Sequence, residues 1–180
     1  MNVYDFDGTI YQGDSGEDFI KFAFSKKPLL MSKHLLKSLK YVLLYQMKKI
    51  EFQEMKEFLF SFVSAINNLE DFTLEFGKTH QKKLKKYYSK VRKDNDVIIS
   101  ASLDVYLLPL CKEIGLKNVI CTKYDVERGK IIGKNCKLEE KVKRFEEVYG
   151  KEAKIESAYG DSKSDVPILK RAEKRICGKR

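Results

Sequence analysis

Apolar residues recur with two different periods along this chain, and the change of period divides it into three zones. Residues 1–6 form a short apolar run that predicts a β-strand, and an Asp-Gly-Thr turn signal follows it. From about residue 14 to about residue 90, apolar pairs recur at helical spacing, which predicts three or four amphipathic helices. After Asp94 the pattern changes to short β-branched runs that alternate with helical segments.

This last zone predicts buried strands separated by helices. The expected strands lie at 96–100, 118–122, 155–159 and 175–177, with a hairpin within 124–132. The expected helices lie at 103–114, 138–149 and 163–170. Strands that alternate with helices in this way form a parallel sheet that is covered on both faces.

The helical zone interrupts this alternation directly after the first strand, so we interpret it as an insertion. We therefore expect an α/β fold with a Rossmann-like, three-layer parallel sheet, built from residues 1–13 and 91–180. Residues 14–90 are expected to form an inserted all-helical cap. Open α/β sheets bind their ligands at the carboxyl ends of the strands, so polar residues at those ends are the candidates for chemistry.

Composition narrows the class of protein without assigning a function. A hydrophobic content of 43% and a charged content of 34% are typical of a folded soluble domain. The 36 basic residues exceed the 26 acidic ones by 10, which favours anionic ligands such as phosphorylated metabolites, acidic lipid or nucleic acid. A positively charged, solubilising surface is the alternative.

Cysteine usage and the absence of targeting signals favour a cytoplasmic protein. The four cysteines lie in the second half of the chain without a CxxC pair, which predicts reduced thiols rather than a zinc site or a disulfide framework. Acidic residues interrupt the apolar N-terminus, so no secretory signal is expected. The most apolar stretch, residues 35–47, contains two lysines and is too short to span a bilayer.

The first candidate motif is Asp5-Phe6-Asp7-Gly8-Thr9, at the end of the first strand. Two carboxylates two residues apart point to the same side of an extended chain, where they repel unless a cation separates them or one keeps its proton. A Mg²⁺ ion would hold one as an ionised nucleophile, while the other carries a proton for a leaving group. We expect the N–H groups of the turn to face an oxyanion. A solvated strand end is the alternative.

Three further candidates follow along the chain. Asp161 and Asp165 come after the 155–159 strand, and carboxylate oxygens are ligands that suit Mg²⁺; a helix N-cap is the alternative function of this segment. Ser100 ends another strand, where its hydroxyl can bind a phosphoryl oxygen or cap a helix. Lys141 lies in a predicted helix and has a solvated helix face as its alternative.

The order of these elements, a strand-end DxDGT, a strand-end serine, a helical lysine and a strand-end GDxxxD, resembles the haloacid dehalogenase superfamily. The resemblance extends from Met1 to about Ala172. The helical insertion after the first motif resembles the cap of the phosphoserine-phosphatase-like branch, as does the segment 133–141. The resemblance implies a phosphatase that acts on a phosphorylated small molecule.

The same resemblance implies a role for each residue of the first motif and its partners. Asp5 would attack phosphorus and form an aspartyl-phosphate, and Asp7 would act as general acid and then as general base. Ser100 and Lys141 would hold phosphoryl oxygens, with Ala101 beside them in the substrate site.

The metal site follows from the same family pattern. Mg²⁺ would be bound by the side chains of Asp5 and Asp161 and by the backbone carbonyl of Asp7. Asp165 would support these ligands from outside the metal's own coordination shell. A phosphotransferase that uses the same aspartyl-phosphate, and a binding protein with a silent site, stay open as alternatives.

The cap offers less guidance on the substrate. By the family resemblance, Asp14 occupies the position at which phosphoserine phosphatases have a glutamate. The first 91 residues contain no arginine that could bind a substrate carboxylate. Phosphoserine is therefore the minor alternative to another metabolite or a lipid head group.

Residues 14–90 contain 15 lysines and 9 acidic residues, a net charge of +6, with a cluster of lysines at 82–86. This cluster indicates either a solvated helix face or a peripheral contact with anionic lipid, whereas no nucleic-acid-binding module is recognisable. The pattern does not indicate an oligomeric state.

Overall fold

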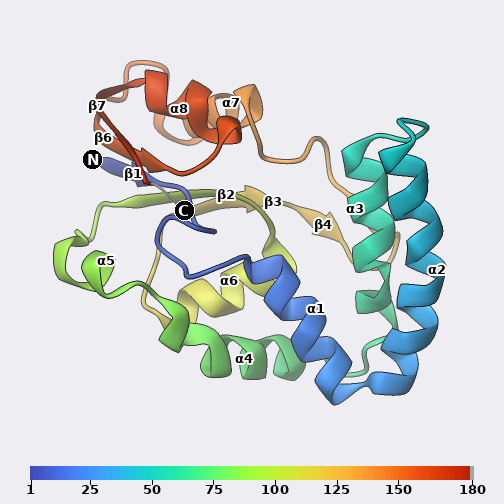
Figure 1. Cartoon of the computed structure of the whole chain (residues 1–180). Coiled ribbons are helices and arrows are strands. Elements are labelled where there is room, and N and C mark those ends of the chain that lie inside the picture. Colours follow the sequence, from blue (N-terminus) through green and yellow to red (C-terminus); the bar gives the residue numbers. More distant parts are fainter. Residues whose placement is uncertain (179–180) are drawn as a thin grey trace.

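A five-stranded parallel sheet runs through the centre of the structure, a computed structural model that describes residues 1–178 (Figure 1). The strands lie in the order β3-β2-β1-β6-β7, and each neighbouring pair is parallel. Their bounds are Asn2–Tyr4 (β1), Val97–Leu103 (β2), Val119–Thr122 (β3), Ile155–Gly160 (β6) and Ala172–Cys177 (β7). The predicted parallel α/β fold is thus confirmed, and the central position of β1 places its carboxyl end between those of β2 and β6.

Two strands extend three residues beyond their predicted bounds. β2 continues past Ser100 to Leu103, which pairs with Thr122 of β3 after a local irregularity in the register. Small polar residues led us to end this strand early, but the backbone N–H of Ser102 donates to Ser100 Oγ (3.0 Å) and keeps the segment ordered. β7 begins at Ala172, three residues before the predicted start.

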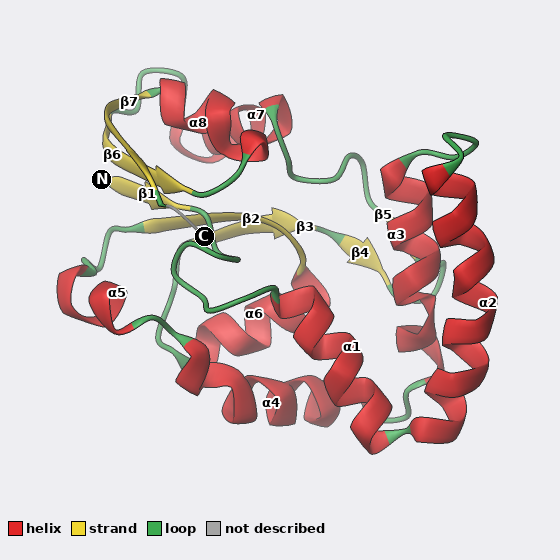
Figure 2. Ribbon diagram, in the orientation of Figure 1, coloured by secondary structure: helices red, strands yellow, loops and turns green. Residues whose placement is uncertain are grey.

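The helices cover both faces of this sheet (Figure 2). The helices of the insertion zone are α1 (Ser15–Lys26), α2 (Pro28–Gln46), α3 (Phe52–Phe60), α4 (Leu69–His80) and α5 (Lys86–Val91). The helices of the second half are α6 (Asp104–Glu113), α7 (Glu139–Tyr149) and α8 (Val166–Lys170). The insertion zone therefore holds five α-helices in the described residues instead of three or four, because the short α5 follows α4 as a separate helix.

Successive side chains of a strand point to opposite faces of the sheet, so the buried strands contribute to two separate hydrophobic cores. Val97 and Ile99 of β2 pack with Phe145 of α7 and with α8 on one face of the sheet. Ile98, between them, belongs to the larger core on the other face, which includes the aromatic side chains of α1 and α4. Both faces of the sheet are thus closed, and its polar residues gather at the strand ends.

The helices of the insertion zone occupy two different places. α4 packs along α6, and α1 packs against α6 and β2, beneath the sheet. α2 and α3 form an antiparallel pair that extends beyond the edge of the sheet, with α2 outermost (Figure 1). The predicted hairpin is present as β4 (Tyr124–Asp125) and β5 (Lys130–Ile131), and it contacts α3. The cap boundaries at residues 14 and 90 stay a prediction.

Candidate active site

Glycine lets two loops approach each other at the carboxyl edge of the sheet. The Asp5 backbone N–H donates to Tyr159 O (2.8 Å), so β1 stays paired with β6 up to the first candidate carboxylate. Gly8 follows with φ of 75°, and a Cβ there would lie 2.1 Å from Asp161 Oδ2. A larger residue would displace the Asp161 carboxylate and would strain the backbone at this positive φ.

The expectation that the N–H groups of this turn face an oxyanion is wrong for Gly8. The Gly8 N–H donates within the loop, to Tyr11 O (3.1 Å) and Gly13 O (2.9 Å). The loop closes on its own backbone, because the N–H groups of Ile10 and Tyr11 also donate within it, to Phe6 O.

Carboxylates from distant parts of the sequence converge at this edge. One oxygen each of Asp5, Asp161 and Asp165 lies within 4.8 Å of the others. Oxygen donors from two carboxylates, with room for phosphate oxygens and water, are what Mg²⁺ prefers in phosphoryl-transfer sites. The donor set therefore fits a magnesium ion between Asp5 and Asp161.

Lys141 supplies the balancing positive charge. It extends from the first turn of α7, is 1% exposed, and its Nζ donates to Asp5 Oδ1 (2.5 Å) and Asp165 Oδ1 (2.6 Å). Burial alone would lower the pKa of Lys141, but the two carboxylates raise it above its usual range, so the side chain is a cation. Burial raises the pKa of Asp5 to about 7, although Lys141 opposes the shift. A bound divalent cation favours the ionised form of such a carboxylate.

Asp165 holds the cluster in place. Its Oδ2 accepts from the backbone N–H of Asp161 (3.2 Å) and of Ser162 (3.0 Å) and from Ser162 Oγ (2.8 Å), forming a capping box. These bonds and Lys141 hold the pKa of Asp165 below its usual range in spite of burial. Both oxygens of Asp165 thus accept hydrogen bonds, and its role as a support of the metal ligands stays a prediction.

The carboxylate of Asp7 is held by residues of α1 and β2. Its Oδ1 accepts from the Ser15 N–H at the start of α1 (2.6 Å), and its Oδ2 accepts from Ser102 Oγ (2.6 Å). Burial and the nearby Asp14 raise the pKa of Asp7 to about 6, although these hydrogen bonds oppose the shift. A carboxyl group with such a pKa can give and take a proton near neutral pH.

Sequence reasoning missed Ser15 and Ser102, which hold Asp7. A hydroxyl two residues after Ser100 on an extended chain points to the same side, which was the available signal for Ser102. Ser15 carried no comparable signal, because its backbone rather than its side chain makes the contact.

The remaining predicted residues lie around the same cleft. Ser100 is 1% exposed and lines the cleft, and it caps no helix because the N-cap of α6 is Leu103. Ala101 also lines the cleft and its carbonyl accepts from Lys56 and Thr122. Asp14 lines the cleft as well, and its side chain caps α1 by accepting from the Glu17 N–H (2.9 Å).

Lys56 is a buried cation of the cleft lining and was not among the predicted residues. It comes from α3 and is 8% exposed, and its Nζ donates to Ala101 O (2.6 Å) and Asn135 Oδ1 (3.0 Å). Burial lowers the pKa of Lys56 to about 8. The lysine-rich composition of the chain hid this residue, since only the docking of α3 distinguishes it from the exposed lysines.

Asp5, Asp7, Ser100 and Asp161 are among the residues that line a cleft of about 660 Å³. Apolar side chains of α1 and α3 also line it; they are Ile20, Phe52, Met55, Leu59 and Phe60. The lining therefore combines polar groups with hydrocarbon surface.

The fold is a Rossmann-like α/β fold, with a candidate aspartate nucleophile at the end of its central strand. A family model described as haloacid dehalogenase-like hydrolase matches residues 3–170. The chain belongs to this family, which confirms the predicted superfamily.

Solved structures share this fold across nearly the whole chain. A protein of unknown function from Bordetella pertussis Tohama I is 18% identical, with a TM-score of 0.81 over 98% of this chain and 88% of that chain. A phosphoserine phosphohydrolase-like protein from Francisella tularensis is 18% identical, with a TM-score of 0.62 over 98% and 87%. A substrate-bound phosphoserine phosphatase is 14% identical, with a TM-score of 0.54 over 97% and 83%. The predicted likeness to the phosphoserine-phosphatase-like branch is thus confirmed for the fold.

Among curated proteins, the chain is similar to Protein CicA of Caulobacter vibrioides. The two are 33% identical over 84 residues, which is 44% of this chain and 38% of that protein. The match thus spans well under half the length of this curated relative.

Proposed function

We propose that this chain is a Mg²⁺-dependent phosphomonoesterase that forms an aspartyl-phosphate on Asp5. The observation that carries the proposal is the convergence of Asp5, Asp161 and Lys141 at one sheet edge, with Asp7 held beside them. Phosphoryl transfer depends on alignment and on neutralising negative charge, and this arrangement supplies both.

In the first half-reaction, an oxygen of Asp5 attacks phosphorus and the bond from phosphorus to the alcohol oxygen breaks. Asp7 gives its proton to the departing alcohol oxygen. Lys141, fixed between Asp5 and Asp165, holds Asp5 in position and offsets the charge of a phosphoryl oxygen. The Ser100 hydroxyl, at the cleft wall, supplies a hydrogen bond to another phosphoryl oxygen.

In the second half-reaction, Asp7 takes a proton from water as the water oxygen attacks phosphorus. The bond between phosphorus and Asp5 breaks, which releases inorganic phosphate and restores the Asp5 carboxylate. Ser15 and Ser102 keep the Asp7 carboxylate oriented through both steps.

Asp5, Asp161 and the Asp7 carbonyl would hold Mg²⁺. When bound, the ion supplies positive charge that neutralises phosphoryl oxygens and keeps Asp5 ionised. The Asp161 carboxylate lies close to Gly8, the residue after Asp7. It is therefore on the side of the site where the Asp7 carbonyl is expected to bind the ion.

The cleft supports a phosphorylated metabolite or lipid head group as the substrate. The apolar side chains in the cleft lining, such as Met55 and Leu59, suit a leaving group that carries hydrocarbon surface. Phosphoserine fits less well, because residues 1–91 supply no arginine for a substrate carboxylate. Lys56, the buried lysine of the cleft, already donates to Ala101 O and Asn135 Oδ1.

The first test is hydrolysis of para-nitrophenyl phosphate by the wild type and by Asp5→Asn, with and without Mg²⁺. We expect the variant to lose about 10⁴- to 10⁶-fold in kcat, as removal of a nucleophile does elsewhere. Asp94→Asn, at an exposed aspartate, is the matched control and should retain wild-type rates. Equal rates for Asp5→Asn and the wild type would overturn the proposal.

A second test separates hydrolysis from phosphoryl transfer. If alcohols added to the reaction yield a new phosphoester at the expense of free phosphate, the chain is a phosphotransferase that uses the same intermediate. We expect free phosphate to account for the substrate consumed.

We also propose a cytoplasmic location. Cys111, Cys121 and Cys136 are buried without disulfide partners, which suits a reducing compartment. Within residues 1–178, no helix combines the length and the apolar character that crossing a bilayer requires.

A further inference from the structure

The outward side of α2 carries a row of leucines that nothing in the described chain covers. Four leucines on α2 are about half exposed or more; they are Leu29 (72%), Leu36 (76%), Leu39 (54%) and Leu43 (49%). Their spacing of 7, 3 and 4 residues places them on one side of an α-helix. Met47 (61%) continues the row at the end of the helix. We call this row the leucine stripe.

The stability of the fold does not require the leucine stripe, because the opposite side of α2 already packs against the molecule. Met31 and Ser38 are buried, and the Tyr41 ring stacks on Phe58 of α3 at 3.6 Å between centroids. His34 Nε2 lies 2.9 Å from Leu59 O. The helix is therefore docked through one side and apolar on the other.

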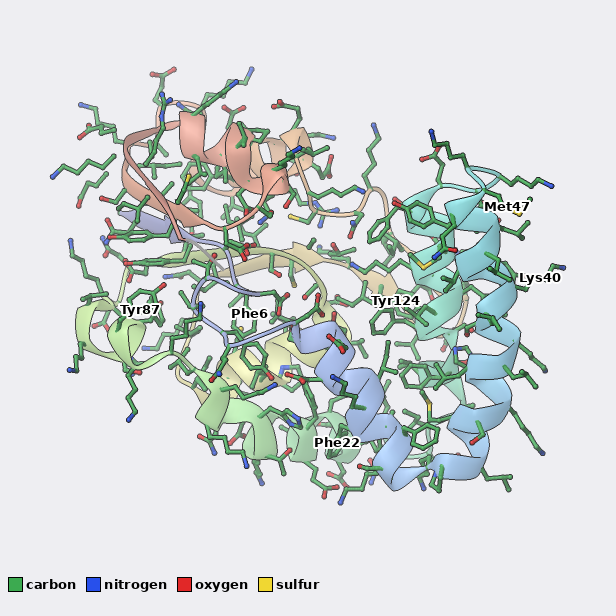
Figure 3. All side chains as sticks on the ribbon, viewed as in Figure 1. Phe6, Phe22, Lys40, Met47, Tyr87 and Tyr124 are labelled. Atoms are coloured by element: carbon green, nitrogen blue, oxygen red, sulfur yellow. The ribbon has the colours of Figure 1, made fainter. Side chains whose placement is uncertain are left out.

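Lysines run beside the leucine stripe. Lys33, Lys37 and Lys40 are exposed and recur at helical spacing, adjacent to the leucines. In Figure 3, Lys40 and Met47 both point away from the rest of the molecule. Residues 19–50 contain eight lysines and not one aspartate or glutamate.

The lysine cluster at 82–86, which the sequence suggested as the lipid contact, is in part turned inward. Lys83 Nζ pairs with Asp18 Oδ2 (2.5 Å), and Lys85 Nζ donates to the Gly8 carbonyl. Tyr87 beside them donates to Thr9 O (2.8 Å). These contacts hold α1 and the loop after β1, so α2 rather than this cluster is the candidate surface.

We propose that the outer side of α2 docks on the surface of a bilayer that contains anionic phospholipid. Charge complementarity selects this occupant: leucines of the stripe enter the boundary between head groups and acyl chains, while the flanking lysines meet lipid phosphates. A second copy of this chain is disfavoured as the occupant, because it would bring lysines against lysines with no acidic residue of α2 between them. α3 lies between α2 and the cleft, so docking leaves the cleft lining free.

The test is co-sedimentation of the full chain with vesicles in 0.1 M salt. Vesicles of equal parts phosphatidylglycerol and phosphatidylcholine should bind the wild type, and vesicles of phosphatidylcholine alone should bind it at least about tenfold more weakly. Lys33→Gln/Lys37→Gln/Lys40→Gln should weaken binding to the anionic vesicles by about 100-fold, at about fivefold per lysine. Leu36→Gln/Leu43→Gln, which keeps helix propensity, should weaken it by at least about tenfold.

Matched controls lie on other surfaces. Lys151→Gln/Lys154→Gln/Lys170→Gln removes the same charge from exposed positions, and Leu108→Gln alters a leucine of α6 that is 44% exposed. Both controls should bind as the wild type does. Equal losses in the α2 variants and the controls would overturn the proposal, as would absence of vesicle binding by the wild type. Binding to polyglutamate without binding to vesicles would also overturn it, and would assign α2 to an acidic protein.

Discussion

The candidate active site and the outer side of α2 both contain lysine, and they use it in opposite ways. Lys141 is 1% exposed and its ammonium is held between two carboxylates at 2.5 and 2.6 Å. On α2, lysines stand in solvent beside exposed leucines, with no acidic residue in the helix. The buried site depends on the exact position of each atom, whereas the surface depends on the sum of many weak contacts. Single substitutions should therefore have large effects in the first region and small ones in the second.

Replacing Lys141 is expected to have the largest effect on stability. Lys141→Met leaves Asp5 and Asp165 buried without their cation, and breaking a buried pair in this way costs about 3–5 kcal/mol in the free energy of unfolding. Urea denaturation without Mg²⁺ measures the loss. Lys143→Met, two residues further along α7 and exposed, should change it by less than about 0.5 kcal/mol. Similar losses in both variants would show that the buried pair has no special role.

Binding of Mg²⁺ should restore part of the folding stability that is lost by burying the carboxylates of the site close together. Because the ion binds the folded site between Asp5 and Asp161, Mg²⁺ at 100 times its Kd should raise the free energy of unfolding by about 2.7 kcal/mol. Thermal denaturation with and without MgCl₂ measures this gain. Asp161→Asn should lose most of it, while Asp94→Asn should keep it. A gain that survives in Asp161→Asn would place the ion elsewhere.

Removing one hydroxyl next to Asp7 should have an intermediate effect on activity. Ser102→Ala deletes the hydrogen bond to Asp7 Oδ2 (2.6 Å), and a bond to a charged group contributes about 1.5–3 kcal/mol. We expect kcat for an aryl phosphate to fall by at least about tenfold with the fold intact by circular dichroism. Ser64→Ala, at an exposed serine, is the control. An unchanged kcat would mean that Ser102 does not position the carboxyl group.

The leucine stripe should give the smallest effect on the protein by itself. Leu36→Gln/Leu43→Gln removes exposed side chains that make no part of the core, so the free energy of unfolding should change by less than about 0.5 kcal/mol per substitution. Turnover of a soluble aryl phosphate should equal that of the wild type. A large loss of stability would show that these leucines pack inside the molecule, which would remove the contrast between the two regions.

The sequence by itself predicted the sheet, the main helices of the second half and the residues that gather at the strand ends. These predictions held because they depend on local pattern: β-branched runs such as residues 97–99 suit a buried strand, and a glycine after Asp7 suits a tight approach. The family resemblance depends on the order of these motifs along the chain, and the sequence shows all of them.

Only the tertiary structure decided which groups hold the candidate proton donor Asp7 and which lysine of α3 enters the cleft. Ser15, Ser102 and Lys56 come from three elements, and their contacts depend on how α1, β2 and α3 meet. No spacing in the sequence records those distances, because each contact joins residues that the fold alone brings together.

The tertiary structure also decided which side of α2 is buried. Leucines occur on both sides of this helix, at Leu30 and Leu35 as well as at Leu36 and Leu43. Its periodicity predicted a helix but could not distinguish a core-facing side from an exposed one. Hydrophobic burial follows the available partner surface, and only the packing of α2 against α3 left one row of leucines in contact with solvent.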